Sequence, residues 1–252
     1  MEAYSADRSL PAKIRRRAVR LYERRPARVQ LHRPMLSISF DDAPQTAAHA
    51  GAAVLAGKGI KGTFFISAGL CGREGPMGVN ATAEEVQALA EAGHEIACHT
   101  WSHLDCGQAD ADAAEAEVER NGAALRAMGL PAVTTFAYPY GDVAFPTKRR
   151  LSRRYDLLRA LHHGLVETGA DLNQCPAVGI EGPQGEATAA SWLAKAQARR
   201  AWLILYTHDV AEQASPWGCT PGALGRLIDA AQAANFDIVT VADGCRRIGA
   251  KA

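Results

Sequence analysis

Short apolar runs alternate with stretches of helical periodicity along the chain from residue 34 onward. The apolar runs predict strands over residues 35–40, 61–67, 95–98, 133–138, 155–160, 177–180, 202–206 and 236–241. The periodic stretches predict helices over residues 45–57, 82–92, 109–128, 187–200 and 221–234. Strands that alternate with helices of this length indicate βαβ units and a parallel sheet.

A run of about seven such units favours a closed or nearly closed α/β barrel over an open sheet. Polar residues that can carry out chemistry directly follow four of the predicted strands: Asp41–Asp42, His99, 138–141 and Thr207–His208. Because the active sites of such barrels lie at the C-terminal ends of the strands, we expect these residues to converge. The Gly-rich segment 161–192 has little clear periodicity, so the sequence predicts its structure less well than that of the other segments.

Residues 1–33 differ in character from the rest and predict an N-terminal extension before a barrel domain over 34–252. They hold ten Lys or Arg residues and three acidic ones. Residues 10–22 predict a basic amphipathic helix with Pro11 in its first turn. Two interpretations of this helix stay open. It packs outside the barrel with solvated arginines, or it anchors residues 10–28 to anionic lipid or an acidic glycan.

The overall charge of +1 argues against a general nucleic-acid binder. The six cysteines form no C-x-x-C pair, and residues 1–33 contain no continuous apolar core of a secretory signal. No apolar run approaches the length of a transmembrane helix. We therefore expect a soluble, cytoplasmic protein with reduced thiols.

The candidate metal ligands are His99 and His103, four residues apart, together with Asp42. A pair of histidines at this spacing is a weak signal alone, but a carboxylate at another strand end strengthens it. Two histidines and one carboxylate suit a divalent first-row metal such as zinc. Three protein ligands leave a coordination position open, as in catalytic sites.

Two further residues could supply proton chemistry at such a site. The side chain of Asp41 diverges from that of Asp42 because successive strand residues point apart, so Asp41 can act as a base toward water. His208 follows a strongly apolar run and could protonate a leaving amine. A histidine hydrogen-bonded to backbone at a strand end is an equally good interpretation of His208 alone.

The ordered motifs resemble those of the polysaccharide deacetylase family, the fourth family of carbohydrate esterases. The resemblance implies the NodB-like α/β fold, a distorted (β/α)-barrel with about seven parallel strands. S-F-D-D-A-P resembles the first family motif, G-H-E-I-A-C-H-T-W-S-H the second, F-A-Y-P-Y-G the third and L-I-L-Y-T-H the fifth. The resemblance runs from about Pro34 to Ile248. Four motifs in the same order make it specific.

This resemblance implies a role for each matching residue. Asp41 is implied to be the catalytic base, and His208 the general acid. Asp42, His99 and His103 are implied to hold a divalent metal, usually zinc. Tyr140 is implied to help form the oxyanion hole through its backbone N–H.

The chain departs from the family pattern at two places. Ala137 stands where many members carry an arginine that holds the base aspartate. The fourth family motif supplies an aspartate that tunes the acid histidine and a tryptophan that lines the substrate groove. No match to it is found, although Asp171 and His163 lie in the region where it would be sought. Trp101 and Trp217 are candidates for stacking against a sugar, with core or rim packing as the alternative.

The resemblance implies a metal-dependent hydrolase that removes N-acetyl groups from an aminosugar-containing oligo- or polysaccharide. A cytoplasmic location would favour a short oligomer or a glycan precursor as substrate. The alternatives are an O-acetyl esterase, a cyclic-amide hydrolase on the same fold, and a barrel that binds glycan or a membrane surface without turnover.

Overall fold

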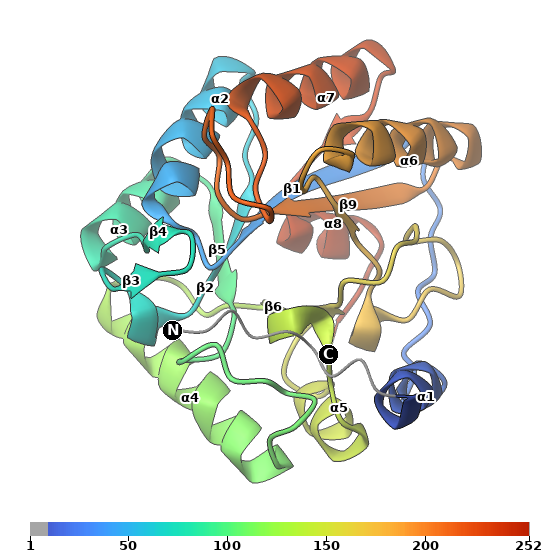
Figure 1. Cartoon of the computed structure of the whole chain (residues 1–252). Coiled ribbons are helices and arrows are strands. Elements are labelled where there is room, and N and C mark those ends of the chain that lie inside the picture. Colours follow the sequence, from blue (N-terminus) through green and yellow to red (C-terminus); the bar gives the residue numbers. More distant parts are fainter. Residues whose placement is uncertain (1–9, 252) are drawn as a thin grey trace.

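The computed structural model describes residues 10–251, and a parallel sheet curls through the centre of the molecule (Figure 1). The order of strands in the sheet is β7, β6, β5, β2, β1, β9, β8, and β10 pairs with the start of β1. The strand bounds are β1 Met35–Asp41, β2 Thr63–Ile66, β5 Glu95–Cys98, β6 Thr135–Ala137, β7 Leu157–Arg159, β8 Val178–Gly179, β9 Trp202–Thr207 and β10 Asp237–Ile238. The predicted distorted α/β barrel is confirmed.

The central strand β1 has all seven of its residues buried, because strands lie on both sides of it and the sheet is covered on both faces. Its longest pairing is with β9, from Met35 opposite Trp202 to Phe40 opposite Thr207. On the other side, Asp41 lies opposite Phe65 of β2. These registers bring the C-terminal ends of β1, β2 and β9 to one level.

One short segment nearly closes the barrel between its two edge strands. Cys175 bridges in parallel to Arg159 of β7, and Val178 pairs with Leu205 of β9. Residues 175–179 therefore connect one edge of the sheet to the other, with no full strand and helix between the two pairings. The barrel is therefore distorted, as expected, because this short connection takes the place of a full βα unit.

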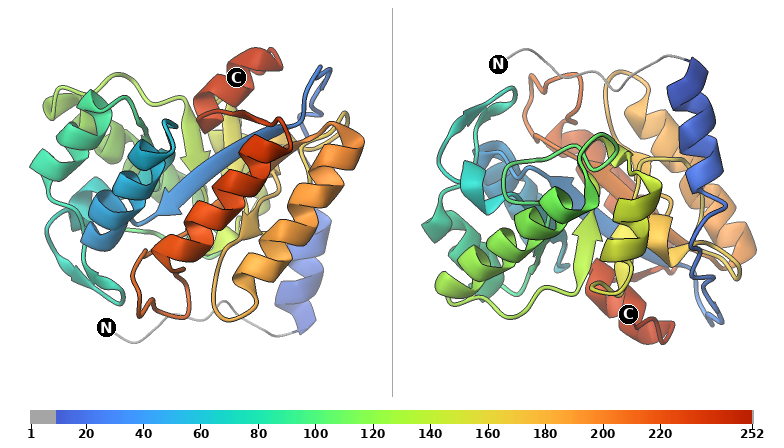
Figure 2. Two further views of the ribbon diagram at one scale, coloured as in Figure 1. Left: turned by 90° about the horizontal axis from the view of Figure 1, so that it is seen from above. Right: turned by 90° about the horizontal axis from the view of Figure 1, so that it is seen from below.

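Helices surround the sheet in both views of Figure 2. Their bounds are α1 Leu10–Val19, α2 Ala52–Gly57, α3 Ala83–Glu91, α4 Ala111–Ala127, α5 Phe145–Leu151, α6 Gly185–Arg199, α7 Pro221–Ala233 and α8 Val241–Arg247. A π-helical turn, Ala47–Gly51, precedes α2, and shorter 3₁₀ turns occupy Ala68–Leu70, Pro139–Gly141 and Leu172–Gln174. In α3, Thr82 and Glu85 form a reciprocal capping box that fixes where the helix begins.

All the predicted strands and barrel helices are present, generally shorter at their ends than the apolar patterns suggested. The sequence did not predict α5, α8 or a small hairpin of β3 (Glu74–Gly75) and β4 (Gly78–Val79). The hairpin strands are two residues each, too short for an alternating pattern to show. The run 236–241 divides into β10 and the start of α8, where Thr240 is the helix cap.

The N-terminal segment packs along the barrel beside the loop that follows β7. Ala27 N donates a hydrogen bond to Ala170 O, and Pro26 bridges to Asp171. The helix α1 ends at Val19, earlier than the predicted residue 22. The division of the chain into an N-terminal extension, residues 1–33, and a barrel domain, residues 34–252, stays a prediction. Within the described residues, no helix is both long and apolar enough to span a bilayer.

Candidate active site

The C-terminal ends of six strands converge on one cavity of about 290 Å³. All six residues predicted for the site line it: Asp41, Asp42, His99, His103, Tyr140 and His208. Further walls come from the β3–β4 hairpin, through Pro76 and Met77, and from Trp217 in the loop after β9. The polar groups predicted from strand ends therefore meet in one place, as the barrel pattern required.

Asp41 and Asp42 diverge at the end of β1, as predicted. Asp41 is the last strand residue and is buried, and its carboxylate faces Arg159. Asp42 has a left-handed backbone with φ of 59°, which turns its side chain toward the two histidines. A left-handed aspartate costs little compared with most residues, so this turn suits the sequence.

The side chains of Asp42, His99 and His103 form a cluster that fits a metal ion. Their ligand atoms lie within 4.8 Å of one another. Asp42 Oδ1 is 3.7 Å from His99 Nε2 and 3.5 Å from His103 Nε2. The same Oδ1 atom is buried and has no hydrogen-bond partner among the described residues. A buried carboxylate oxygen left without a donor is costly, and a cation bound between the three groups would satisfy it.

His99 is held in the orientation that a metal ligand needs. Its Nδ1 lies 2.8 Å from the carbonyl oxygen of Ala137, so we assign the proton to Nδ1 and the lone pair to Nε2. Burial lowers the pKa of His99 to about 4, and neighbouring His103 acts in the same direction. The imidazole is therefore neutral and able to donate its lone pair at ordinary pH.

The loop between the two histidines is positioned by a carboxylate that the sequence analysis did not single out. Glu117 of α4 accepts hydrogen bonds from the backbone N–H groups of Trp101 and Ser102, at 3.0 and 2.8 Å. Thr100 and His103 have left-handed backbones, with φ of 63° and 60°. The histidine pair thus belongs to a tight loop rather than a helix, and Glu117 fixes its path.

The guanidinium of Arg159 takes the position beside Asp41 that the family pattern assigns to an arginine in the third motif. Its Nη2 lies 2.5 Å from both carboxylate oxygens of Asp41, and the side chain is fully buried. Arg159 is the last residue of β7 and lies opposite Ala137 of β6. The arginine that the third motif lacks at Ala137 is therefore supplied by Arg159 of the adjacent strand, β7.

Arg159 also sets the charge state of Asp41. Burial alone raises the pKa of this carboxyl, but the Arg159 guanidinium outweighs it, and His99 and His208 contribute in the same direction. The pKa of Asp41 consequently lies below its ordinary value. The rings of Phe65 and Tyr206 flank the guanidinium at 5.0 and 5.1 Å.

Glu181, two residues after β8, takes the place of the acidic partner that the fourth motif would supply to the candidate acid. Its Oε1 lies 3.1 Å from His208 Nδ1, and its Oε2 accepts a hydrogen bond from the Tyr206 hydroxyl at 3.3 Å. Burial lowers the pKa of His208, but the bond to Glu181 and the charges of Asp41 and Asp42 raise it to about 9. His208 is therefore an imidazolium near neutral pH in this structure.

Asp171 and His163, the residues in the region searched for a fourth motif, do not contact His208. Asp171 accepts a hydrogen bond from the buried Lys148 ammonium at 2.7 Å, and His163 packs beside Trp192. The sequence analysis did not single out Glu181, although a polar residue directly after the weak predicted strand 177–180 is a signal that could have found it. Arg159 lies inside the predicted strand 155–160, so a search for polar residues directly after strands misses it.

Tyr140 lies in the 3₁₀ turn after β6 and also has a left-handed backbone, with φ of 59°. Its ring packs edge-on against His103, with centroids 4.5 Å apart. The aromatic ring thus supports a metal-ligand candidate, and the same residue lines the cavity. The oxyanion role of its N–H stays a prediction.

The two tryptophans proposed for sugar stacking differ in position. Trp217 lines the cavity and is 38% exposed. Trp101 instead packs beside Gly69, where an added Cβ would lie 2.6 Å from its ring, and under the Arg120 guanidinium. Only Trp217 is placed to meet a substrate.

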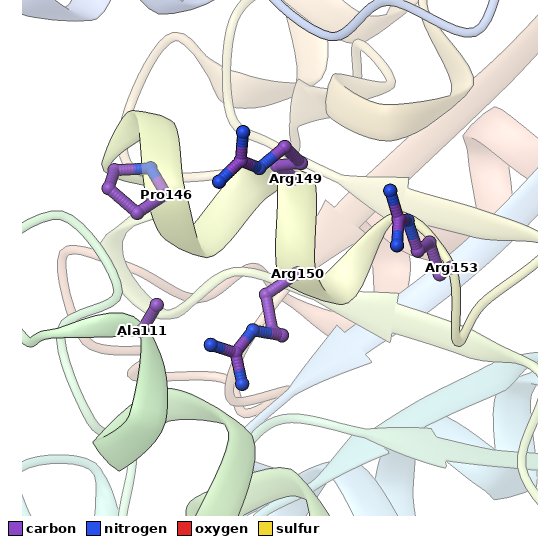
Figure 3. Close-up of a pocket in the computed structure, with 5 residues that line it drawn as sticks. All are labelled: Ala111, Pro146, Arg149, Arg150 and Arg153. Atoms are coloured by element: carbon purple, nitrogen blue, oxygen red, sulfur yellow. The ribbon is translucent and has the colours of Figure 1, made fainter.

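A second cavity, of about 250 Å³, lies where α5 faces the first turn of α4 (Figure 3). Arg149, Arg150 and Arg153 project around it, beside Pro146 and Ala111. It is lined by no carboxylate or imidazole that could act with these arginines. Of these two cavities, only the strand-end cavity is lined by carboxylates and imidazoles.

The barrel and its strand-end groups define a site with an Asp-His-His cluster that could hold a metal ion. Residues 28–157 match the family model for polysaccharide deacetylase. Because this match covers more than half of the chain, the protein belongs to the polysaccharide deacetylase family. A comparison with curated proteins gave no match.

Several solved structures share the fold. A putative polysaccharide deacetylase from Mycobacterium smegmatis aligns with a TM-score of 0.68 and 16% identity over 90% of this chain and 96% of that chain. The chitin deacetylase of Colletotrichum lindemuthianum gives 0.62 and 19%, over 88% and 92%. A family 4 acetyl xylan esterase from Clostridium thermocellum, in complex with a cobalt ion, gives 0.58 and 18%, over 83% and 89%. At identities this low, the structural similarity shows a common fold and nothing more.

Proposed function

We propose that the protein is a metal-dependent deacetylase that hydrolyses N-acetyl groups on an aminosugar-containing oligo- or polysaccharide and releases acetate. The observation that carries the proposal is the convergence of three functional pairs or clusters on one cavity. These are Asp41 with Arg159, Asp42 with the two histidines, and His208 with Glu181.

Asp42, His99 and His103 would hold the metal, which we propose to be zinc. The metal-binding relative from Clostridium thermocellum, with its cobalt ion, supports a divalent ion in this fold. Such an ion supplies Lewis acidity toward the acyl oxygen and the attacking water. The neutral His99 and the unpaired Asp42 Oδ1 are the features of this chain that favour it.

Asp41 is proposed as the base that accepts a proton from the attacking water. Arg159 holds the carboxylate ionised and in one orientation, so no reorganisation is needed before proton transfer. Attack on the acetyl carbon gives a tetrahedral oxyanion. The backbone N–H of Tyr140 is proposed to donate a hydrogen bond to that oxygen.

His208 is proposed as the acid that protonates the leaving nitrogen. Glu181 engages Nδ1, which leaves Nε2 as the ring nitrogen available to the substrate. The C–N bond breaks as the amine takes this proton, and the water oxygen leaves with the acetyl group as acetate. The imidazolium state of His208 near neutral pH suits this step.

The proposal that the substrate is an N-acetyl amide rests on His208 as the general acid. A poor leaving group such as an amine needs full protonation, and a histidine kept charged by Glu181 provides it. An O-acetyl esterase is the second candidate, since acetyl xylan esterase is among the related folds. A cyclic-amide hydrolase that works without metal is disfavoured by the complete Asp-His-His cluster.

A barrel that binds without turnover is the remaining alternative. It was suggested by the missing arginine at Ala137 and the missing fourth motif. Arg159 and Glu181 occupy the corresponding places beside Asp41 and His208, so these departures no longer favour it.

The cavity walls favour a short substrate. The β3–β4 hairpin stands on one side through Pro76 and Met77, and Trp217 stands at the rim. We propose a short acetylated oligomer or a glycan precursor, handled in the cytoplasm. Six free cysteines, five of them buried, are in keeping with a reducing location.

The direct test measures acetate release from N-acetylglucosamine oligomers and from acetylated xylan by the zinc-loaded protein. We expect turnover of the amide substrate and loss of that turnover with a chelator. Hydrolysis of the ester substrate alone would replace the N-acetyl assignment with the esterase. No release from either, by protein shown to hold zinc, would favour the binding-only barrel.

A further inference from the structure

The N-terminal segment exposes large apolar side chains to solvent. Among the described residues, four large hydrophobic side chains are exposed, and three of them lie here: Leu10 at 69%, Ile14 at 59% and Leu21 at 80%. Leu10 and Ile14 are one helical turn apart on α1, and Leu21 follows just beyond its end. We call residues 10–24 the basic segment.

The exposed side of α1 is fixed by contacts on the opposite side. Arg15 Nη2 lies 2.6 Å from Asp142 Oδ2, and Arg16 Nη1 lies 3.6 Å from the same atom. Val19 is fully buried, and its carbonyl accepts a hydrogen bond from the Lys148 ammonium at 2.9 Å. Arg15, Arg16 and Val19 thus face the protein, while Leu10 and Ile14 are exposed to solvent. This is the reverse of an ordinary surface helix.

Exposed cations lie beside these apolar side chains. Lys13, Arg17, Arg20 and Arg24 are all exposed on the basic segment. No described carboxylate forms an ion pair with any of the four, by the salt bridges present in the structure. Burial lowers the pKa of Arg20, and its neighbours Arg17 and Arg16 lower it further. The exposed cations repel one another, which favours an anionic partner.

A cavity of about 340 Å³ opens within the same surface. Arg20, Leu21 and Arg24 form one wall, and His162 and His163 contribute to another. His162 Nδ1 is buried and has no hydrogen-bond partner among the described residues. The carboxylate that also lines the cavity, Asp171, is already neutralised by Lys148. The cavity can therefore accept a phosphate group, with guanidinium and imidazole donors around it.

We propose that the basic segment docks the protein on an anionic membrane surface. Leu10, Ile14 and Leu21 enter the boundary between headgroups and acyl chains, and the cavity between Arg20 and His162 receives a lipid phosphate. An acidic glycan would satisfy the cations but would leave the three apolar side chains in water. A lipid surface satisfies both kinds of group.

The position of α1 is compatible with access to the active site from such a surface. In both views of Figure 2, the N-terminal end of α1 lies toward the same side of the molecule as the loop after β9 and the β3–β4 hairpin, which line the site. Docking does not depend on the reaction proposed above. It can be measured without any substrate.

The test is co-sedimentation of the full chain with vesicles of phosphatidylcholine alone and of phosphatidylcholine with about one third phosphatidylglycerol. We expect binding to the anionic vesicles only, weakened by salt. The I14Q/L21Q variant should bind at least tenfold more weakly, since two exposed side chains no longer insert. The R20Q/R24Q variant should lose about fivefold for each cation and show a shallower dependence on salt.

The matched control is R149Q/R153Q, which removes two exposed arginines from the α5 cavity of Figure 3, where no large apolar side chain is exposed. It should bind within twofold of the unchanged protein. Equal losses in this control and in R20Q/R24Q would overturn the proposal, as would unchanged binding by I14Q/L21Q. Binding to dextran sulfate without binding to anionic vesicles would assign the segment to an acidic glycan instead. Circular dichroism checks that each variant is folded.

Discussion

Arg159 and Asp41 form a fully buried ion pair that joins the ends of β7 and β1 across the floor of the candidate active site. One guanidinium nitrogen lies 2.5 Å from both oxygens of the carboxylate. The pair sets the ionisation and the orientation of the proposed base together. It is supplied from a different strand than the third family motif, opposite Ala137.

Replacing Arg159 therefore tests whether Asp41 acts through this pair. R159A should lower kcat by about 10²-fold or more, the usual contribution of a positioned acid or base. It should also lower the free energy of unfolding by about 3–5 kcal/mol, since Asp41 is left buried without its partner. R159K keeps the charge, so its kcat and its free energy of unfolding should lie between those of the unchanged protein and those of R159A. Zinc content, measured on each variant, should stay unchanged.

The control for this prediction is R153A, an exposed arginine six residues before Arg159. It should change neither kcat nor stability beyond the small effects usual for surface charges. If R159K and R159A both turned over substrate at the full rate while folded, Asp41 would not need the pair and its role as base would be in doubt.

The contact between Glu181 and His208 predicts how activity depends on pH. The pKa of His208 is raised to about 9, so the acid is charged below that pH and the rate should fall as the pH rises through it. E181Q removes the carboxylate whose hydrogen bond raises the pKa of His208 most, and should move this basic limb to lower pH by about 1 pH unit or more. A bound metal ion lowers the pH of this limb equally in the unchanged protein and in E181Q, so the measured quantity is the difference in pH between the two limbs.

The same pair has a consequence for stability. Because the pKa of His208 is higher in the folded protein than in the unfolded chain, its contribution is fully present below about pH 6.5 and is lost as the pH rises through about 9. E181Q should lose this contribution at neutral pH. Identical pH profiles of unfolding for both proteins would show that Glu181 does not hold the His208 charge.

The Asp-His-His cluster predicts distinct effects on metal binding. D42A and H103A remove a ligand and should abolish tight zinc binding in calorimetry. E117A leaves all three ligands but frees the loop that carries His103, and should weaken binding about 10–100-fold. E119A removes an exposed carboxylate of the same helix, which pairs only with Arg154 among the described residues, and should bind zinc normally. Equal affinity of E117A and E119A would contradict the positioning role of Glu117.

Much of this architecture could be predicted from the sequence, for a physical reason. Strands buried on both faces read as continuous apolar runs, so 35–40 and 202–206 identified β1 and β9 almost to the residue. The strand ends then pointed to Asp41, Asp42, His99 and His208. Short elements such as β3, β4 and α8 carry too few residues for a periodic signal.

The partners of the site residues could not be assigned from sequence for a different reason. Arg159 reaches Asp41 across 118 positions, and this depends on the order of β7 and β1 around the barrel. Glu181 meets His208 only because residues 175–179 cross from one edge strand to the other. Such contacts follow from three-dimensional closure, and a linear pattern identifies candidates for them without pairing them.

The buried ion pair of Lys148 and Asp171 predicts a large effect on stability far from the chemistry. The Lys148 ammonium is fully buried and contacts Val19 O, Asp171 and Gln174, so it joins α5, the N-terminal segment and the loop after β7. K148A should cost about 3–5 kcal/mol in denaturant unfolding. R149A, on the exposed side of the same helix, should cost little. Equal midpoints for the two variants would contradict this assignment.

In the proposed mechanism, Asp41 removes a proton from water at a site whose metal is held by other residues. The most direct measurement is acetate release from N-acetylglucosamine oligomers by D41N, after calorimetry has shown that it holds zinc as tightly as the unchanged protein. We expect D41N to bind zinc fully and to have its turnover reduced by about 10²-fold or more. Turnover by zinc-loaded D41N at the rate of the unchanged protein would contradict it.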